Sequence, residues 1–201
     1  VDVGRKIRIV PRWEIHSCSV DRVNIIIEPG PSFGSGDHPS TLMALELLET
    51  AMESLQLCNV SPSVIDVGTG TGVLAIAAKS LGAELVVALD IDPVSVFTIC
   101  RKNVELNRSN WQGSPTESPL CFFVGELAAI SGRFQIVSAN LAAPVLIRLR
   151  DNIMSVASRY IMLSGIADEM FKHVRGAYRE YADIIEVKHE LGWNALLLEK
   201  L

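Results

Sequence analysis

The sequence predicts an α/β protein with a doubly wound, mostly parallel sheet of seven strands that ends in an antiparallel C-terminal strand. Strand-like and helix-like segments alternate from Val64 onward, which is the order of parallel strands joined by crossover helices. Two strand-like segments, Asp183 to Glu190 and Asn194 to Lys200, then follow each other around Gly192, so the sheet closes with an antiparallel hairpin. With 201 residues, of which 49% are hydrophobic, the chain can cover such a sheet on both faces.

The first 40 residues are interpreted as an extended lead-in rather than as a domain of their own. Lys6 to Val10 and Arg22 to Ile27 have strand composition, and proline follows each of them closely. A loop of small residues comes next and leads into a helix from about Thr41 to Leu55, with Ser40 or Thr41 as the expected N-cap. His38 in that loop is expected to face solvent.

The segment from Val64 to Pro93 predicts one strand, turn, helix and strand in succession. An apolar run from Val64 to Val67 is followed by a turn with glycine at every second position. Val73 to Lys79 then has helical composition, and Glu84 to Leu89 forms the second strand. Asp90 stands directly at the end of that strand, where ligands bind in open α/β sheets.

The remaining segments continue the alternation. The predicted elements are a helix from Val94 to Leu106, strands at Leu120 to Val124 and Phe134 to Ala139, a helix from Leu141 to Val156, a strand from Arg159 to Leu163, and a helix from Asp168 to Glu180.

The glycine-rich turn predicts a nucleotide-type cofactor site. Gly68, Gly70 and Gly72 let the backbone approach a ligand closely, and Asp90 lies 18 residues beyond Gly72, a separation that suits a carboxylate on ribose hydroxyls. A dinucleotide site has the spacing G-x-G-x-x-G, which this turn lacks. Asp66 adds a negative charge that would repel a pyrophosphate but suits the ammonium and sulfonium of S-adenosylmethionine. We therefore favour S-adenosylmethionine over a nicotinamide dinucleotide.

The carboxyl ends of the predicted strands are expected to meet at one crevice. Ile91 and Glu126 follow two of these ends and complete the candidate cofactor site, although Glu126 also suits the start of a helix. Asn140 ends another strand, where its amide oxygen and the carbonyl of Leu141 are candidates to orient an amine acceptor. The alternative is that Asn140 caps the next helix. We assign no metal ligands.

The composition limits which binding partners and which cellular compartment we expect for this protein. The formal net charge of −5 gives no electrostatic footprint for nucleic acid, so we expect no direct nucleic-acid partner. We expect no membrane partner, because no apolar run approaches the roughly 18 residues that span a bilayer. The four cysteines lack metal-ligand spacing, and Cys100 and Cys121 lie in apolar contexts typical of buried thiols, so we expect a cytoplasmic protein.

Several motifs together resemble the bacterial PrmA methyltransferases. These are the loop EPGPSFGSGDHPST from Glu28 to Thr41, the run IDVGTGTGVLAIAAKSLGA, then LDIDP, SANL ending at Leu141, and LSGI ending at Ile166. The resemblance extends from about Ile7 to Lys200, and its most specific part is the P-G-x-x-F-G-[ST]-G-x-H loop. It implies a Rossmann-like class I methyltransferase fold that uses S-adenosylmethionine to methylate lysines and the N-terminal amine of ribosomal protein eleven of the large subunit.

The resemblance also implies roles for individual residues and a division of the chain. Cofactor contacts fall on Thr41, Gly68, Asp90 and Asn140, and the methionine end of the cofactor is shaped by Phe33, Gly34 and Gly36. Residues 1–40 would be a lead-in with a cofactor-covering loop, and residues 41–201 the catalytic domain. Members of the family carry a further N-terminal domain that recognises the ribosomal protein, and we expect it to be absent from these 201 residues.

Two alternatives stay open from the sequence. The chain could be a stand-alone methyltransferase of the same fold that acts on a small molecule or on another protein. It could also be a catalytically silent module that only binds the cofactor. The oligomeric state is unknown.

Overall fold

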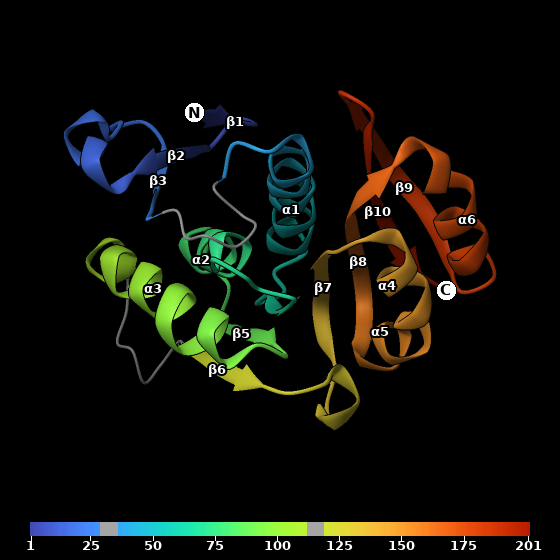
Figure 1. The fold of residues 1–201 in the computed structure, drawn as a ribbon. Coiled ribbons are helices and arrows are strands. Elements are labelled where there is room, and N and C mark those ends of the chain that lie inside the picture. The colour runs from blue at the N-terminus through green and yellow to red at the C-terminus, as the bar shows by residue number, and fades with distance from the viewer. Residues whose placement is uncertain (29–35, 112–118) are drawn as a thin grey trace.

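The structure, a computed structural model, describes residues 1–28, 36–111 and 119–201. A seven-stranded sheet forms its centre, and its strand order is β6-β5-β4-β7-β8-β10-β9 (Figure 1). The strands are β4 (Ser63–Val67), β5 (Leu85–Asp90), β6 (Leu120–Val124), β7 (Phe134–Asn140), β8 (Ala157–Ala167), β9 (Ala182–Glu190) and β10 (Trp193–Lys200). The predicted fold class is confirmed.

The directions of the strands place a ligand crevice beside β4. The strands β4 to β8 pair in parallel, and β10 runs antiparallel to both of its neighbours, β8 and β9. The chain builds outward from β4 through β5 to β6, then returns to place β7 on the other side of β4. Such a reversal opens a crevice at the carboxyl ends of the strands.

Helices cover both faces of this sheet (Figure 1). One hydrophobic core joins the sheet to helices α1, α2 and α3, and the other joins it to α4, α5 and α6. Neighbouring residues of β4 show the division, because Val64 and Ile65 are both fully buried but belong to opposite cores. The helices are α1 (Pro39–Leu57), α2 (Val73–Ser80), α3 (Arg101–Asn107), α4 (Ala143–Arg148), α5 (Arg150–Val156) and α6 (Asp168–Tyr178).

Three expectations about the helices need correction. The helix predicted from Leu141 to Val156 is two helices, α4 and α5, separated at Leu149. The helix predicted from Val94 contains a π-helical stretch, Ser95–Cys100, before α3. The N-cap of α1 is His38, whose ring nitrogen accepts a hydrogen bond from the Ser40 backbone N–H at 3.2 Å, because Pro39 opens the helix.

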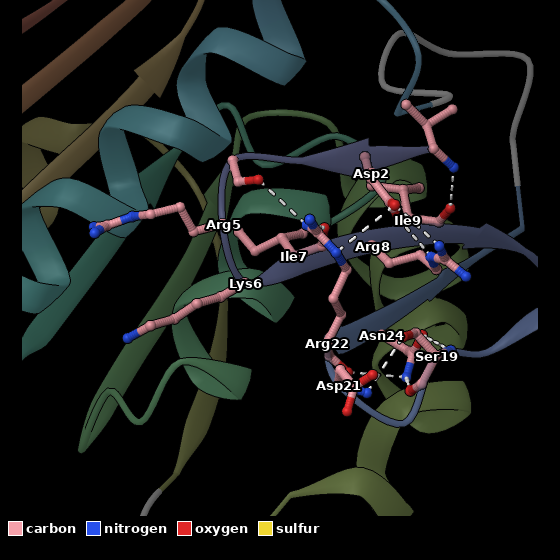
Figure 2. Close-up of polar contacts among 12 residues, drawn as sticks. Asp2, Arg5, Lys6, Ile7, Arg8, Ile9, Ser19, Asp21, Arg22 and Asn24 are labelled. Carbon is pink, nitrogen blue, oxygen red and sulfur yellow. Dashed lines mark hydrogen bonds and ion pairs between the residues drawn. The ribbon is translucent and has the colours of Figure 1, made fainter.

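The lead-in forms a small sheet with the order β1-β2-β3, made of β1 (Asp2–Val3), β2 (Ile7–Pro11) and β3 (Val23–Ile27). A short 3₁₀ segment, Arg12–Ser17, lies between β2 and β3 and lets these two strands pair in parallel. Asp2 bridges Arg8 and Arg22 on the outside of this sheet (Figure 2). Apolar residues of β2 and β3 belong to the same core as α1 and α2, so the lead-in packs against the helices that cover this face of the main sheet.

The cysteines follow the expectation only in part. Cys100 is fully buried, as predicted, and the structure places it against the glycine turn. Cys121 is exposed, because it lies on β6 at the edge of the sheet. In the described parts of the chain, no helix combines the length and the apolar character that crossing a bilayer needs.

Candidate functional site

The turn between β4 and α2 has the geometry that only glycine accommodates easily. Gly68 has a φ of +74°, and a Cβ there would lie 2.4 Å from Cδ2 of Leu141. Gly72 has a φ of +84°, and its Cβ would lie 2.5 Å from Sγ of Cys100. Any side chain at these two positions would therefore strain the backbone and collide with the neighbouring strand tip or helix.

Backbone hydrogen bonds fasten this turn to the neighbouring strand. The N–H groups of Gly68 and Thr69 donate to the Leu89 carbonyl at 2.8 and 2.9 Å. The N–H of Gly70 donates to Oδ2 of Asp90 at 3.1 Å. The turn is thus built against the carboxyl end of β5.

Asp66 lies beneath the turn with only 1% of its surface exposed. Its carboxylate accepts hydrogen bonds from the hydroxyls of Thr69 and Ser138, at 2.8 and 2.9 Å, and from the backbone N–H of Ala75. Burial raises the pKa of Asp66 to about 6, although these three donors act in the opposite direction. Asp66 therefore ties the turn to β7 and α2, and an action of its charge on a cofactor stays a prediction.

Asp90 stands at the crevice, as its position at a strand end predicts. Its second carboxylate oxygen, Oδ1, accepts from the Asp92 backbone N–H at 3.1 Å, and its carbonyl accepts from Gly125 N–H at 3.0 Å. The next side chain, Ile91, is 75% exposed. The tip of β5 therefore offers a half-buried carboxylate beside an exposed apolar side chain.

Glu126 has the role of a helix start. It is exposed and precedes the 3₁₀ helix Leu127–Ala129, where its carbonyl accepts from the Ala129 N–H at 3.0 Å. A contact of its side chain with a cofactor stays a prediction.

Asn140 ends β7 and contacts the start of α1. Its Nδ2 lies 3.4 Å from Oγ1 of Thr41, which is itself buried. The alternative of a helix cap is wrong, because the N-cap of α4 is Ala142 and no side chain caps it. The side chain of Asn140 is therefore available at the crevice rather than committed to α4.

Two acceptor oxygens converge next to Gly165 on the neighbouring strand β8. A Cβ on Gly165 would lie 2.7 Å from the Leu141 carbonyl oxygen and 2.9 Å from Oδ1 of Asn140. The strand passes this closely because the residue is glycine and has a φ of +79°. Both oxygens therefore lie close to the same residue of β8 and close to each other, and a role of the pair in holding an amine stays a prediction.

Serine side chains inside the strands hold this part of the crevice together, and the sequence analysis missed them. Ser164, fully buried on β8, donates to the Ser40 carbonyl at 2.7 Å and so attaches α1 to the sheet. Ser138, fully buried on β7, donates to Asp66. The available signal was a hydroxyl in the middle of an otherwise apolar strand, because a buried polar group needs a partner.

The upstream loop is described only in part. Phe33 and Gly34 lie outside the described residues. Gly36 has a φ of +91°, and a Cβ there would meet Cγ2 of Ile9 at 2.9 Å, so it packs against β2. His38 contacts the ring of Trp193 edge to face, with 4.9 Å between the ring centroids. The expectation that His38 faces solvent is therefore wrong.

This architecture is found in solved methyltransferases. The magnesium protoporphyrin IX methyltransferase of Synechocystis, whose crystal structure contains bound S-adenosylhomocysteine, superposes with a TM-score of 0.57 at 17% identity over 85% of this chain and 88% of that one. Together with the strand order, the likeness shows the class I methyltransferase fold.

Sequence comparison identifies the family within that class. All residues 1–201 match the family model described as ribosomal protein L11 methyltransferase (PrmA). A ribosomal protein L11 methyltransferase of Geobacter sp. strain M21 is 37% identical over 100% of this chain and 63% of its own length. The crystal structure of the ribosomal protein L11 methylase of Lactobacillus delbrueckii subsp. bulgaricus superposes with a TM-score of 0.80 at 28% identity, covering 99% of this chain and 96% of that one.

The chain belongs to the ribosomal protein L11 methyltransferase (PrmA) family. The resemblance inferred from the loop and turn motifs is confirmed. The chain spans about three-fifths of the length of the curated relatives it matches.

Proposed function

We propose that this chain carries the catalytic site of an S-adenosylmethionine-dependent N-methyltransferase that modifies lysine side chains or the N-terminal amine of ribosomal protein L11. The family and the names of its members support the substrate. The observation that supports amine chemistry is the convergence of Asn140 Oδ1 and the Leu141 carbonyl next to Gly165.

The residues at the crevice fit the cofactor. Gly68 and Gly72 let the turn pack closely against Leu141 and Cys100. Asp90 lies beside the turn and suits two ribose hydroxyls. Ile91 offers exposed apolar surface for a nucleobase. When bound, S-adenosylmethionine supplies a methyl group on a positively charged sulfur, which is an electrophile for a neutral amine.

The loop before α1 completes the proposed cofactor site. Phe33, Gly34 and Gly36 are assigned to the methionine end, and Thr41 is assigned to the cofactor through its place beside Asn140. We divide the chain accordingly into a lead-in with the covering loop, residues 1–40, and a catalytic domain, residues 41–201.

The chain's own residues orient the acceptor amine and do not act as a strong general base. Asn140 Oδ1 and the Leu141 carbonyl accept N–H bonds from the amine and direct its lone pair toward the cofactor, so that most of the rate arises from positioning. A lysine amine has a reference pKa of about 10.4, and loss of water on binding lowers it toward the reactive neutral form.

The test combines cofactor binding with methyl transfer. Calorimetry should show that the chain binds S-adenosylmethionine and does not bind NAD, and labelled cofactor should transfer its methyl group to purified ribosomal protein L11. In Asn140→Ala the turnover number should fall by about a hundredfold or more, because one positioning contact is lost. The control Asn110→Ala alters an exposed asparagine on the 3₁₀ helix Arg108–Asn110 and should keep the rate.

The outcomes separate the parts of the proposal. Tight NAD binding without S-adenosylmethionine binding would overturn the enzyme class. Cofactor binding with transfer to a different acceptor, and none to ribosomal protein L11, would overturn the substrate. A wild-type rate in Asn140→Ala would overturn the role of that residue.

A further inference from the structure

Two buried asparagines on α3 attach the lead-in to the catalytic sheet. Asn103 and Asn107 are 1% and 0% exposed and lie one helical turn apart. Asn107 pairs with Ile26 of β3, as its Oδ1 accepts the Ile26 N–H at 2.8 Å and its Nδ2 donates to the Ile26 carbonyl at 2.7 Å. A carboxamide carries the same acceptor and donor as a peptide group, so it pairs with a strand as a neighbouring strand would.

Asn103 makes the same kind of pair with Glu28, which directly follows β3. Its Oδ1 accepts the Glu28 N–H at 2.8 Å, and its Nδ2 lies 3.3 Å from the Glu28 carbonyl. Both asparagines therefore hold the free edge of the lead-in, and they do so from the interior, where unpaired polar groups are costly.

Only one of the two asparagines reaches the cofactor turn. Nδ2 of Asn103 also donates to the carbonyl of Thr71 at 3.0 Å, between Gly70 and Gly72, whereas the second bond of Nδ2 in Asn107 goes to the Asn103 carbonyl within α3. Thr71 is itself 1% exposed, so water does not take the place of this bond readily. One carboxamide thus fixes the end of β3 and the glycine-rich turn at the same time.

We propose that Asn103 is a positioning residue that couples the seating of the lead-in to the shape of the glycine-rich turn, and through the turn to cofactor affinity. The identity of the ligand rests on the proposed function, whereas the coupling itself concerns the ligand-free chain. Because such coupling is reciprocal, a bound cofactor also stabilises the attachment of Glu28 to Asn103.

The first experiment needs no ligand. Amide hydrogen exchange is followed in the wild type, in Asn103→Ala and in Asn107→Ala, with the N–H of Gly72 as the reporter because it closes the turn on Thr69 at 2.8 Å. Both variants should lower the melting temperature, since each removes a buried pair with β3. Only Asn103→Ala should speed exchange at Gly72, by about fivefold or more. Equal exchange at Gly72 in the two variants would overturn the coupling.

The second experiment measures affinity for S-adenosylhomocysteine by calorimetry. Asn103→Ala should raise the dissociation constant about fivefold to tenfold, while Asn107→Ala should change it less than about twofold. Asn103→Asp keeps the acceptor for the Glu28 N–H but removes the donor to the Thr71 and Glu28 carbonyls, so its dissociation constant should rise as in Asn103→Ala. An affinity loss of the same size in Asn107→Ala would assign the effect to general stability and overturn the proposal.

A third comparison uses the wild type alone and decides the matter if the Asn103 variants do not fold. Saturating S-adenosylhomocysteine should slow exchange of the Glu28 amide, held by Asn103, more than that of the Ile26 amide, held by Asn107. Equal slowing would overturn the coupling. If the wild type does not bind this ligand, the proposed function fails. The link between the turn and β3 is then decided by hydrogen exchange in the ligand-free Gly72→Ala variant, in which the Glu28 amide is compared with the Ile26 amide.

Discussion

The buried carboxylate of Asp66 makes the stability of this protein depend on pH in a direction opposite to that of most carboxylates. Burial raises the pKa of Asp66 to about 6 from its ordinary 3.8. The folded protein therefore holds this proton more tightly than the unfolded chain does. The contribution to stability is complete below pH 3.8 and is lost as the pH rises through about 6.

The size of the effect follows from the shift. A difference of roughly two pKa units corresponds to about 3 kcal/mol at neutral pH, at about 1.4 kcal/mol for each unit. Between about pH 4.5 and about pH 7 the loss amounts to about 2 kcal/mol. Asp66→Asn cannot ionise and should show none of it.

Urea denaturation of ligand-free protein measures the difference. The free energy of unfolding of the wild type minus that of Asp66→Asn should fall by about 2 kcal/mol as the pH rises over that interval. Asp92→Asn is the matched control, because the Ser95 hydroxyl and the neighbouring backbone N–H groups lower the pKa of Asp92, so its contribution is lost instead as the pH falls. A difference between wild type and Asp66→Asn that stays constant with pH would refute this account of the buried carboxylate.

Three further substitutions test the turn, the first helix and the last one. Gly72→Ala should destabilise the fold by about 2 kcal/mol or more in thermal denaturation. Adding Cys100→Ala should relieve the collision with Sγ but not the strain of a positive φ. Full recovery of stability in the double variant would show that the backbone at this position is not strained. His38→Ala removes the cap on the Ser40 N–H and should cost about 1 kcal/mol, so an unchanged melting temperature would show that the cap contributes nothing. Gly176→Ala, where a Cβ would meet nothing within 4 Å, should stabilise α6 by about 0.5–1 kcal/mol, and a destabilised variant would contradict the open space there.

The elements that the sequence predicted well are those in which a local pattern is sufficient. The glycines at 68 and 72 predicted a turn, and Asp90 predicted a strand end, because backbone sterics and strand length are encoded over a few residues. The break at Leu149 was missed, since apolar residues on both sides continue a helical pattern through it. The capping role of His38 was missed as well, because serine and threonine are the usual caps and the following proline shifted the start of α1.

Residues that are far apart in sequence decided the finer points of the site. Asn140 looked equally suited to a helix cap, and the structure excluded that role because the N-cap of α4 is Ala142. Asn140 lies instead beside Thr41 and Gly165. Asn103 looked like an ordinary helical residue, yet it pairs with Glu28 and reaches Thr71.

The sequence by itself determined the fold class, the family, the glycine-rich turn and the strand end at Asp90, because each of these is carried by short motifs and by the alternation of strands and helices. Only the tertiary structure decided that Asp66 is a buried, hydrogen-bonded carboxylate with a raised pKa, and that the oxygens of Asn140 and Leu141 lie next to Gly165. The physical reason is that burial, and therefore the proton affinity of a carboxylate and the direction of an acceptor, depends on which strands and helices pack together. That packing joins residues that are far apart in the sequence, 99 positions for Thr41 and Asn140 and 124 positions for Ser40 and Ser164.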